Sequence, residues 1–262
     1  MIKAGKLFQI STLVAALLAA QFSFVAQASA QQTVQPAATS NEYDGYDEYY
    51  NAPIEDPFET VNRGIFKFNE VFDTVLMKPV AKTYVYVVPQ FGRDRVHNAV
   101  TNLTEPVSML NGFLQGDPER GFTSMWRFII NSTLGVAGLF DFAGHNFDLT
   151  HKDEDFGQTM GVYGWGHGPY IVLPIFGPSS GRDAFGRVVD IFSNPFNYSP
   201  SDEFVYGRAI VTAIDARSRN LDLVEEIYRN SVDPYATIRS AYAQRRTALI
   251  RNNESENGDI GL

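Results

Sequence analysis

The sequence of 262 residues contains no cysteine, which removes several kinds of chemistry at once. Disulfides, thiolate metal sites and cysteine nucleophiles all require the sulfur atom. A lipid anchor attached to a cysteine is excluded for the same reason. One imidazole and several carboxylates gather at His151–Asp155, but a second histidine at helical spacing is missing. We therefore predict neither a metal site nor a cofactor.

Positive charge is scarce. The sequence has 21 Lys and Arg against 30 Asp and Glu, a formal net charge of −9. Binding to a nucleic-acid backbone depends on clustered lysine and arginine. The charge balance therefore excludes nucleic acid as an expected partner.

Long uninterrupted apolar runs are also scarce. Gly121–Phe140 comes closest, and its only charged side chain is Arg127. A membrane-spanning helix needs roughly 20 consecutive apolar residues, whereas here a polar patch at residues 131–133 is followed by Gly135 and Gly138. The pattern predicts an apolar hairpin that bends, and not a spanning helix.

The N-terminus has the pattern of an export signal. Two lysines precede an apolar run, and Ala28–Ala30 supplies the small residues of a cleavage site. We predict a cleaved signal peptide at residues 1–30, with retention as a membrane anchor as the alternative. A disordered, acidic and tyrosine-rich leader is expected at 31–52, a helical domain at 53–251 and a flexible tail at 252–262.

Helix signals dominate the rest of the chain. Aspartate followed by proline marks helix starts at Asp56, Asp117 and Asp233. Apolar residues recur at steps of three and four from Phe58 to Val75, and we expect this stripe to serve core packing first and membrane contact second. Further helices are expected at 78–89, 93–114, 118–134, 182–192, 203–229 and 234–251.

One segment, Tyr170–Phe176, resembles a strand, and Pro174 argues against a central one. The surrounding stretch Asp155–Asp183 is rich in glycine, proline and aromatic residues, which indicates contact with apolar material. The fold class predicted from these patterns is mainly α, a single helical domain with glycine-rich hairpins and little or no β-structure.

The hypothesis that the protein is an enzyme rests on Gly177–Gly181, which matches the G-x-S-x-G motif of serine hydrolases around Ser179. In that fold the histidine follows the serine, whereas all four histidines here precede it. Capping of the following helix by Ser179 or Ser180 explains the motif more simply. We predict that the protein is not an enzyme, with a periplasmic serine esterase using Ser179 as the alternative.

Six blocks of the sequence closely resemble the MlaA family, also called VacJ, over about Asp56–Arg251. In chain order the blocks are DPFETVNRGIFKFNEVFD (56–73), KPVAKTYVYVVP (78–89), NLTEPVSMLNGFLQGD (102–117), RFIINSTLGVAGLFDFAG (127–144), EDFGQTMGVYGWGHGPYIVLPIFGPSSGRD (154–183) and DPYATIRSAYAQR (233–245).

The resemblance implies a helical ring around an amphipathic channel, seated in the inner leaflet of the Gram-negative outer membrane. Members associate with porin trimers and pass mislocalised outer-leaflet phospholipid to a soluble periplasmic carrier of the MlaC kind. Familiar members carry a lipid anchor on an N-terminal cysteine, which this sequence lacks. We therefore expect an exported protein at the periplasmic face of the outer membrane without a lipoprotein anchor.

Residues that could border the lipid path follow from the sequence and the resemblance together. The run that contains Arg127, Asn131 and Phe140 combines polar groups with apolar walls, as a phospholipid requires. The resemblance implies that the glycine-containing hairpin lies beside the channel, which adds Gly135 and Gly138 as candidates. The two glycines either allow the hairpin to move or permit the chain to pack closely in a turn. The sequence does not decide between these two interpretations. A structural envelope protein without a through-path remains a further alternative to transport.

Overall fold

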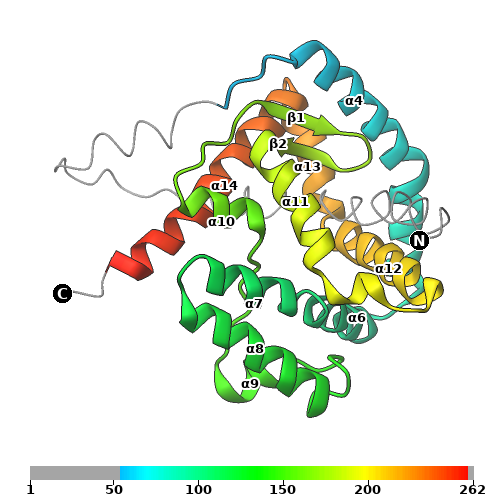
Figure 1. Ribbon diagram of the computed structural model, residues 1–262. Helices are drawn as coiled ribbons and strands as arrows, with labels where there is room; N and C mark the ends of the chain where they lie inside the picture. Colours follow the sequence, from blue (N-terminus) through cyan, green and yellow to red (C-terminus); the bar gives the residue numbers. More distant parts are fainter. Residues whose placement is uncertain (1–53, 259–262) are drawn as a thin grey trace, which may run out of the picture.

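The computed structural model describes residues 54–258, and side chains as far as Arg251 (Figure 1). The expected signal peptide (1–30) and leader (31–52) lie outside the described residues, as does the end of the tail at 259–262. The elements are α4 (Glu59–Phe72), η2 (Asp73–Met77), α5 (Lys78–Val87), α6 (Gln90–Asn102), α7 (Glu105–Leu114), α8 (Pro118–Thr133), α9 (Phe142–Phe147), α10 (Phe156–Val162), β1 (Tyr170–Leu173), β2 (Gly177–Ser180), α11 (Gly181–Ser193), η3 (Pro195–Tyr198), α12 (Asp202–Arg219), α13 (Leu221–Asn230) and α14 (Pro234–Gly258).

These elements form a closed circuit of contacts. From α4 the circuit passes to β1, β2, α14, α10, α7, α8, α6, α12 and α5, which returns through η2 to α4. In Figure 1 the β-hairpin lies at one end of the molecule, and α7, α8 and α9 lie at the other. The prediction of a single, mainly helical domain with little β-structure is confirmed.

Proline explains where the helices depart from the expected bounds. The helix expected at 93–114 is interrupted between α6 and α7, because Pro106 has no amide to donate to Asn102. The helix expected from Lys78 is present as α5, with Pro79 in its first turn, but it follows α4 without a break. The missing amide donor of Pro79 coincides with η2, a π-helical turn that joins α4 to α5.

Two further bounds differ from the expected ones. The helix expected at 203–229 divides at Asn220, and α14 continues to Gly258. The predicted strand pairs antiparallel with β2, with Tyr170 opposite Ser180, and Pro174 lies in the turn between the strands.

The interior is unusually polar. Apart from Ile250 and Val172, the largest fully buried side chains carry polar groups: Arg217, Tyr170, Gln158, Glu105, Asn62, Asn69, Asn111, Asp215 and Ser108. Two small clusters supply the apolar core, and Phe66 packs against both. Buried polar groups are tolerated only when they are paired, because each unpaired one costs free energy.

The apolar stripe of the first helix faces outward. Val61, Phe68 and Val75 are 61%, 53% and 72% exposed. The expectation that this stripe serves core packing first is wrong for these three residues. Ile65 of the same stripe and Phe66, which lies off it, both pack against the buried core. Large exposed apolar side chains also lie at helical spacing on α8 (Phe122, Trp126, Ile129) and α11 (Phe185, Val188, Phe192).

Arginine–carboxylate pairs connect the helices through the polar interior. Arg217 Nε lies 2.6 Å from Asp73 Oδ1, joining α12 to η2. On α14, Arg246 reaches Asp155 at 2.6 Å and Asp183 at 2.7 Å. These pairs bind elements that are far apart in the sequence, so they fix the tertiary arrangement.

Replacing Arg246 tests this dependence. Arg246→Met leaves Asp155 and Asp183 without their shared cation, and removing one partner of a buried pair costs about 3–5 kcal/mol. The control is Lys67→Met, which breaks an exposed pair with Glu70 and costs at most about 1 kcal/mol. Denaturant unfolding in detergent micelles measures both, and equal losses would contradict the prediction.

A second prediction concerns pH. Burial first, and then the charge of Asp155, raise the pKa of Asp190 from 3.8 to about 7. Because the folded state favours the protonated carboxyl, stability is present at low pH and falls as the pH rises through about 7. Asp190→Asn keeps one oxygen, which in the position of Oδ1 still accepts from Asn111 and from the Phe156 amide. The variant should therefore gain stability over the wild type between pH 5 and pH 8 in thermal unfolding, whereas exposed Asp222→Asn should show no such trend.

Candidate functional site

The hairpin that follows α8 brings the five predicted site residues into one unit. Arg127 and Asn131 lie on α8, and the chain turns at residues 134–140 before α9 begins. The amide of Gly138 donates to the Asn131 carbonyl at 2.8 Å, and the amide of Phe140 donates to the Gly135 carbonyl at 2.9 Å. These two bonds bring the returning chain against the end of the helix.

Arg127 is buried, with 3% of its surface exposed, and its charge is fully engaged. Its Nε lies 2.6 Å from Glu105 Oε1, and its Nη2 lies 3.1 Å from Asp141 Oδ1. It also donates to the carbonyl of Leu149. The side chain therefore holds α7, α8 and the start of α9 together.

The neutral side chain of Asn131 also joins α8 to the start of α9. Its amide donates to Asp141 Oδ1 at 2.9 Å, and its carbonyl accepts from the amide of Ala143 at 2.8 Å. Burial opposes ionisation of Asp141, but hydrogen bonds from Asn131 and the Gly144 amide, together with the Arg127 charge, hold its pKa below the usual value. Asp141 thus stays ionised at the base of the hairpin.

Close packing explains both glycines. A Cβ on Gly135 would lie 2.2 Å from the Phe140 carbonyl oxygen, and one on Gly138 would lie 2.7 Å from Cβ of Asn102. Gly138 also has a φ of +86°. Its neighbours Val136 and Ala137 share the left-handed region, with φ of 54° and 55°, where a side chain costs of order 1–3 kcal/mol. The hairpin is therefore a packed turn that stores strain.

The outer surface of the hairpin is apolar. Leu134, Val136, Leu139 and Phe140 are all exposed. The guanidinium of Arg95 on α6 lies over the Phe140 ring, 4.6 Å from its centroid. The unit thus combines a buried polar base with an apolar outer surface.

An apolar cavity of about 420 Å³ lies beside α10. It is lined by Leu114, Phe156, Thr159, Met160, Tyr163, Trp165 and Phe185. Several of these belong to the glycine- and aromatic-rich stretch from Asp155, for which we expected apolar contact. Its walls are suited to a hydrocarbon chain, because they offer few polar partners.

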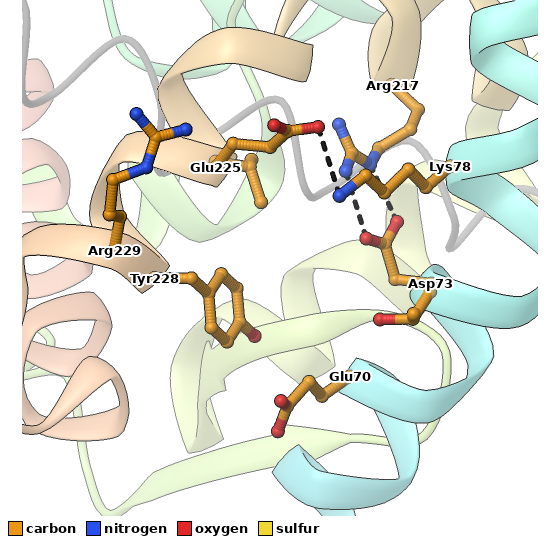
Figure 2. A pocket seen from close by; sticks show the side chains of 9 residues that line it. Glu70, Asp73, Lys78, Arg217, Glu225, Tyr228 and Arg229 are labelled. Carbon is orange, nitrogen blue, oxygen red and sulfur yellow. Dashed lines mark hydrogen bonds and ion pairs between the residues drawn. The ribbon is translucent and has the colours of Figure 1, made fainter.

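A charged cavity, which the sequence did not indicate, lies between η2–α5 and α12–α13. Its volume is about 350 Å³ (Figure 2). It is lined by Glu70, Asp73, Thr74, Lys78, Arg217, Val224, Glu225, Tyr228 and Arg229. These residues come from segments more than a hundred positions apart, so no local motif marks them.

The structure gives no support to Ser179 as a nucleophile. Ser179 is 0% exposed in β2, and its hydroxyl lies 3.5 Å from the Ser180 carbonyl. Ser180 is the helix cap, because its Oγ accepts from the Asp183 amide at 3.2 Å. Within residues 54–251 no group of three or more histidine and carboxylate side chains is arranged to hold a metal ion, and His151 pairs with Glu105.

The protein is a helical domain whose apolar helix faces point outward. Buried arginine–carboxylate pairs connect the helices in its interior. No helix in the described part of the chain is long and apolar enough to cross a bilayer. The model of the family described as MlaA lipoprotein matches residues 54–249. The chain belongs to this family.

Relatives and a solved structure agree with this assignment. The intermembrane phospholipid transport system lipoprotein MlaA of Escherichia coli K12 is 37% identical over 202 residues, which is 76% of this chain and 80% of that protein. An uncharacterised Rickettsia bellii protein is 39% identical over 76% of this chain and 78% of its own. A structure reported as the structural basis for maintenance of bacterial outer membrane lipid asymmetry matches with a TM-score of 0.67 and 39% identity, covering 75% of this chain and 99% of that one.

The packing of Gly135 leads to a prediction. Gly135→Ala forces the Phe140 carbonyl away and should lower the free energy of unfolding by about 1–3 kcal/mol. The matched control is Gly64→Ala on α4, where nothing lies within 4 Å of the new Cβ and a gain of about 0.5–1 kcal/mol is expected. Thermal unfolding compares them, and two variants of equal stability would show that the hairpin is not closely packed.

Proposed function

We propose that this protein transports phospholipid in a Gram-negative envelope. It removes mislocalised phospholipid from the outer leaflet of the outer membrane and passes it to a soluble periplasmic carrier. The observation that carries the proposal is the outward orientation of the apolar helix faces, seen in a chain whose relatives are named as intermembrane phospholipid transport lipoproteins.

Outward apolar faces favour residence in a lipid leaflet. Burying a valine, leucine or phenylalanine side chain contributes about 1.5–3 kcal/mol, and exposed side chains of this kind lie on most helices from α4 to α12. This sequence has no cysteine to carry an anchor. In our proposal the apolar faces and a porin trimer together hold the protein at the inner leaflet of the outer membrane.

A phospholipid needs polar groups beside apolar walls along its path. The hairpin supplies an apolar outer surface at Leu134 and Phe140, and the cavity lined by Trp165 supplies further apolar wall. Arg127 and Asn131 are engaged within the protein, so we propose that they fix the hairpin in place beside an amphipathic channel. Transport by this route breaks no covalent bond.

Complementation tests the proposal. The gene would be expressed in an Escherichia coli strain that lacks its own MlaA, and phospholipid in the outer leaflet would be measured with a phospholipase added outside the cells. We expect outer-leaflet phospholipid to fall toward the wild-type level. Lipid extraction and mass spectrometry of the purified protein should also detect bound phospholipid. If the protein is correctly exported, yet neither result is seen, the structural-protein alternative is favoured.

A surface variant tests the role of the apolar faces. Val61→Gln combined with Phe68→Gln removes two exposed apolar side chains from α4 and should weaken binding to lipid vesicles by about a hundredfold or more. The control, Thr60→Gln, changes an exposed polar residue of the same helix. Vesicle flotation measures the binding, and unchanged flotation of the double variant would contradict residence through this face.

A further inference from the structure

The charged cavity between η2–α5 and α12–α13 has a balanced lining. Its cations are Lys78, Arg217 and Arg229, and its anions are Glu70, Asp73 and Glu225. Its volume of about 350 Å³ lies within the range of small-ligand pockets. Figure 2 shows Glu70 near one end, Arg229 and Glu225 near the other, and Tyr228 between them.

Several of these charged side chains already form ion pairs with one another. Arg217 donates to both carboxylate oxygens of Asp73, at 2.6 and 2.9 Å, so this pair closes the floor of the cavity. Lys78 lies 3.0 Å from Glu225 Oε1, and Lys82 reaches the same oxygen from outside the lining. Hydrogen bonds from Lys78 and Lys82 lower the pKa of Glu225 to about 2, so it stays ionised.

Other groups keep capacity for a ligand. Arg229 is exposed and has no hydrogen bond or ion pair among the described residues. Glu70 uses one carboxylate oxygen, Oε2, for Lys67 at 2.9 Å. Burial, and then the charges of Glu70 and Asp73, raise the pKa of Tyr228 above its usual value, so its hydroxyl remains a proton donor.

We propose that this cavity binds the zwitterionic head group of a phospholipid, with the phosphate at Arg229 and the ammonium at Glu70 beside the Tyr228 ring. The assignment rests on the proposed function and names the lipid class that the function selects. Arginine and lysine are the usual phosphate partners in proteins. A carboxylate next to an aromatic ring favours an ammonium group.

The surroundings of the cavity suit the rest of a lipid. Val71 and Val75 are exposed on the same stretch, each one position beyond a lining residue. Acyl chains can therefore lie on apolar surface while the head group occupies the charged cavity. One wall is η2, and π-helical turns within helices frequently occur at functional sites.

The experiment uses full-length mature protein, stripped of lipid in detergent, and short-chain phosphatidylethanolamine and phosphatidylglycerol as probes. Native mass spectrometry measures both dissociation constants. We expect wild type to prefer the ethanolamine lipid. Glu70→Gln should weaken that lipid about tenfold and leave the glycerol lipid unchanged, whereas Arg229→Gln should weaken both. Glu226→Gln, an exposed neighbour on α13 outside the lining, is the matched control, and thermal unfolding checks that each variant is folded.

Three results would overturn the assignment. The first is an unchanged lipid preference in Glu70→Gln, and the second is unchanged binding in Arg229→Gln. In the third, free phosphoethanolamine binds as tightly as the short-chain lipid, which would show that the cavity takes the soluble head group. If complementation and bound lipid are nevertheless found for the wild type, only this inference fails. If wild-type protein neither binds lipid nor complements, the proposed function fails with it.

Discussion

Buried pairing between arginine and carboxylate is the constraint on which this structure depends. Because the large apolar faces point outward, they contribute little to holding one helix against another in the described chain. Arg217–Asp73, Arg127–Glu105 and Arg246–Asp183 take over that task. Such pairs add little net stability compared with an apolar core, but they strongly penalise any arrangement that leaves one partner alone. The polar interior thus favours one geometry while many large apolar side chains remain on the surface.

The helices and their class could be predicted from the sequence, because capping residues and apolar periodicity act locally. The direction of each apolar face could not. Periodicity shows that the side chains from Phe58 to Val75 share a face, but it does not say whether that face points into the core or outward, and the assumption that apolar residues pack inside the protein gave the wrong answer for most of them. Phe66 packs inward against two buried clusters and edge-to-face on Tyr235, and these partners come from elements distant in the sequence.

The candidate site, too, could be predicted only in part from the sequence. Gly135, Gly138 and the polar residues before them lie within one short segment, so sequence and family resemblance together located the hairpin. The burial of Arg127 follows from Glu105 and Asp141 arriving from other elements, and nothing within the segment indicates it. The charged cavity was missed because Glu70 and Arg229 are distant in the chain and each looks like an ordinary solvated residue of an amphipathic helix.

The closed circuit of contacts has a consequence for how the chain acquires its structure. Asp56, just before α4, is bound by Tyr235 and Arg239 of the last helix, and Asn62 on α4 bonds to the Tyr170 carbonyl in β1. Part of the docking site for the beginning of the domain is therefore absent until its end has been synthesised. Contacts of such high sequence separation form slowly, since the loop between them must close first. During that interval the large apolar side chains of the partly folded chain stay exposed, which makes it prone to aggregation.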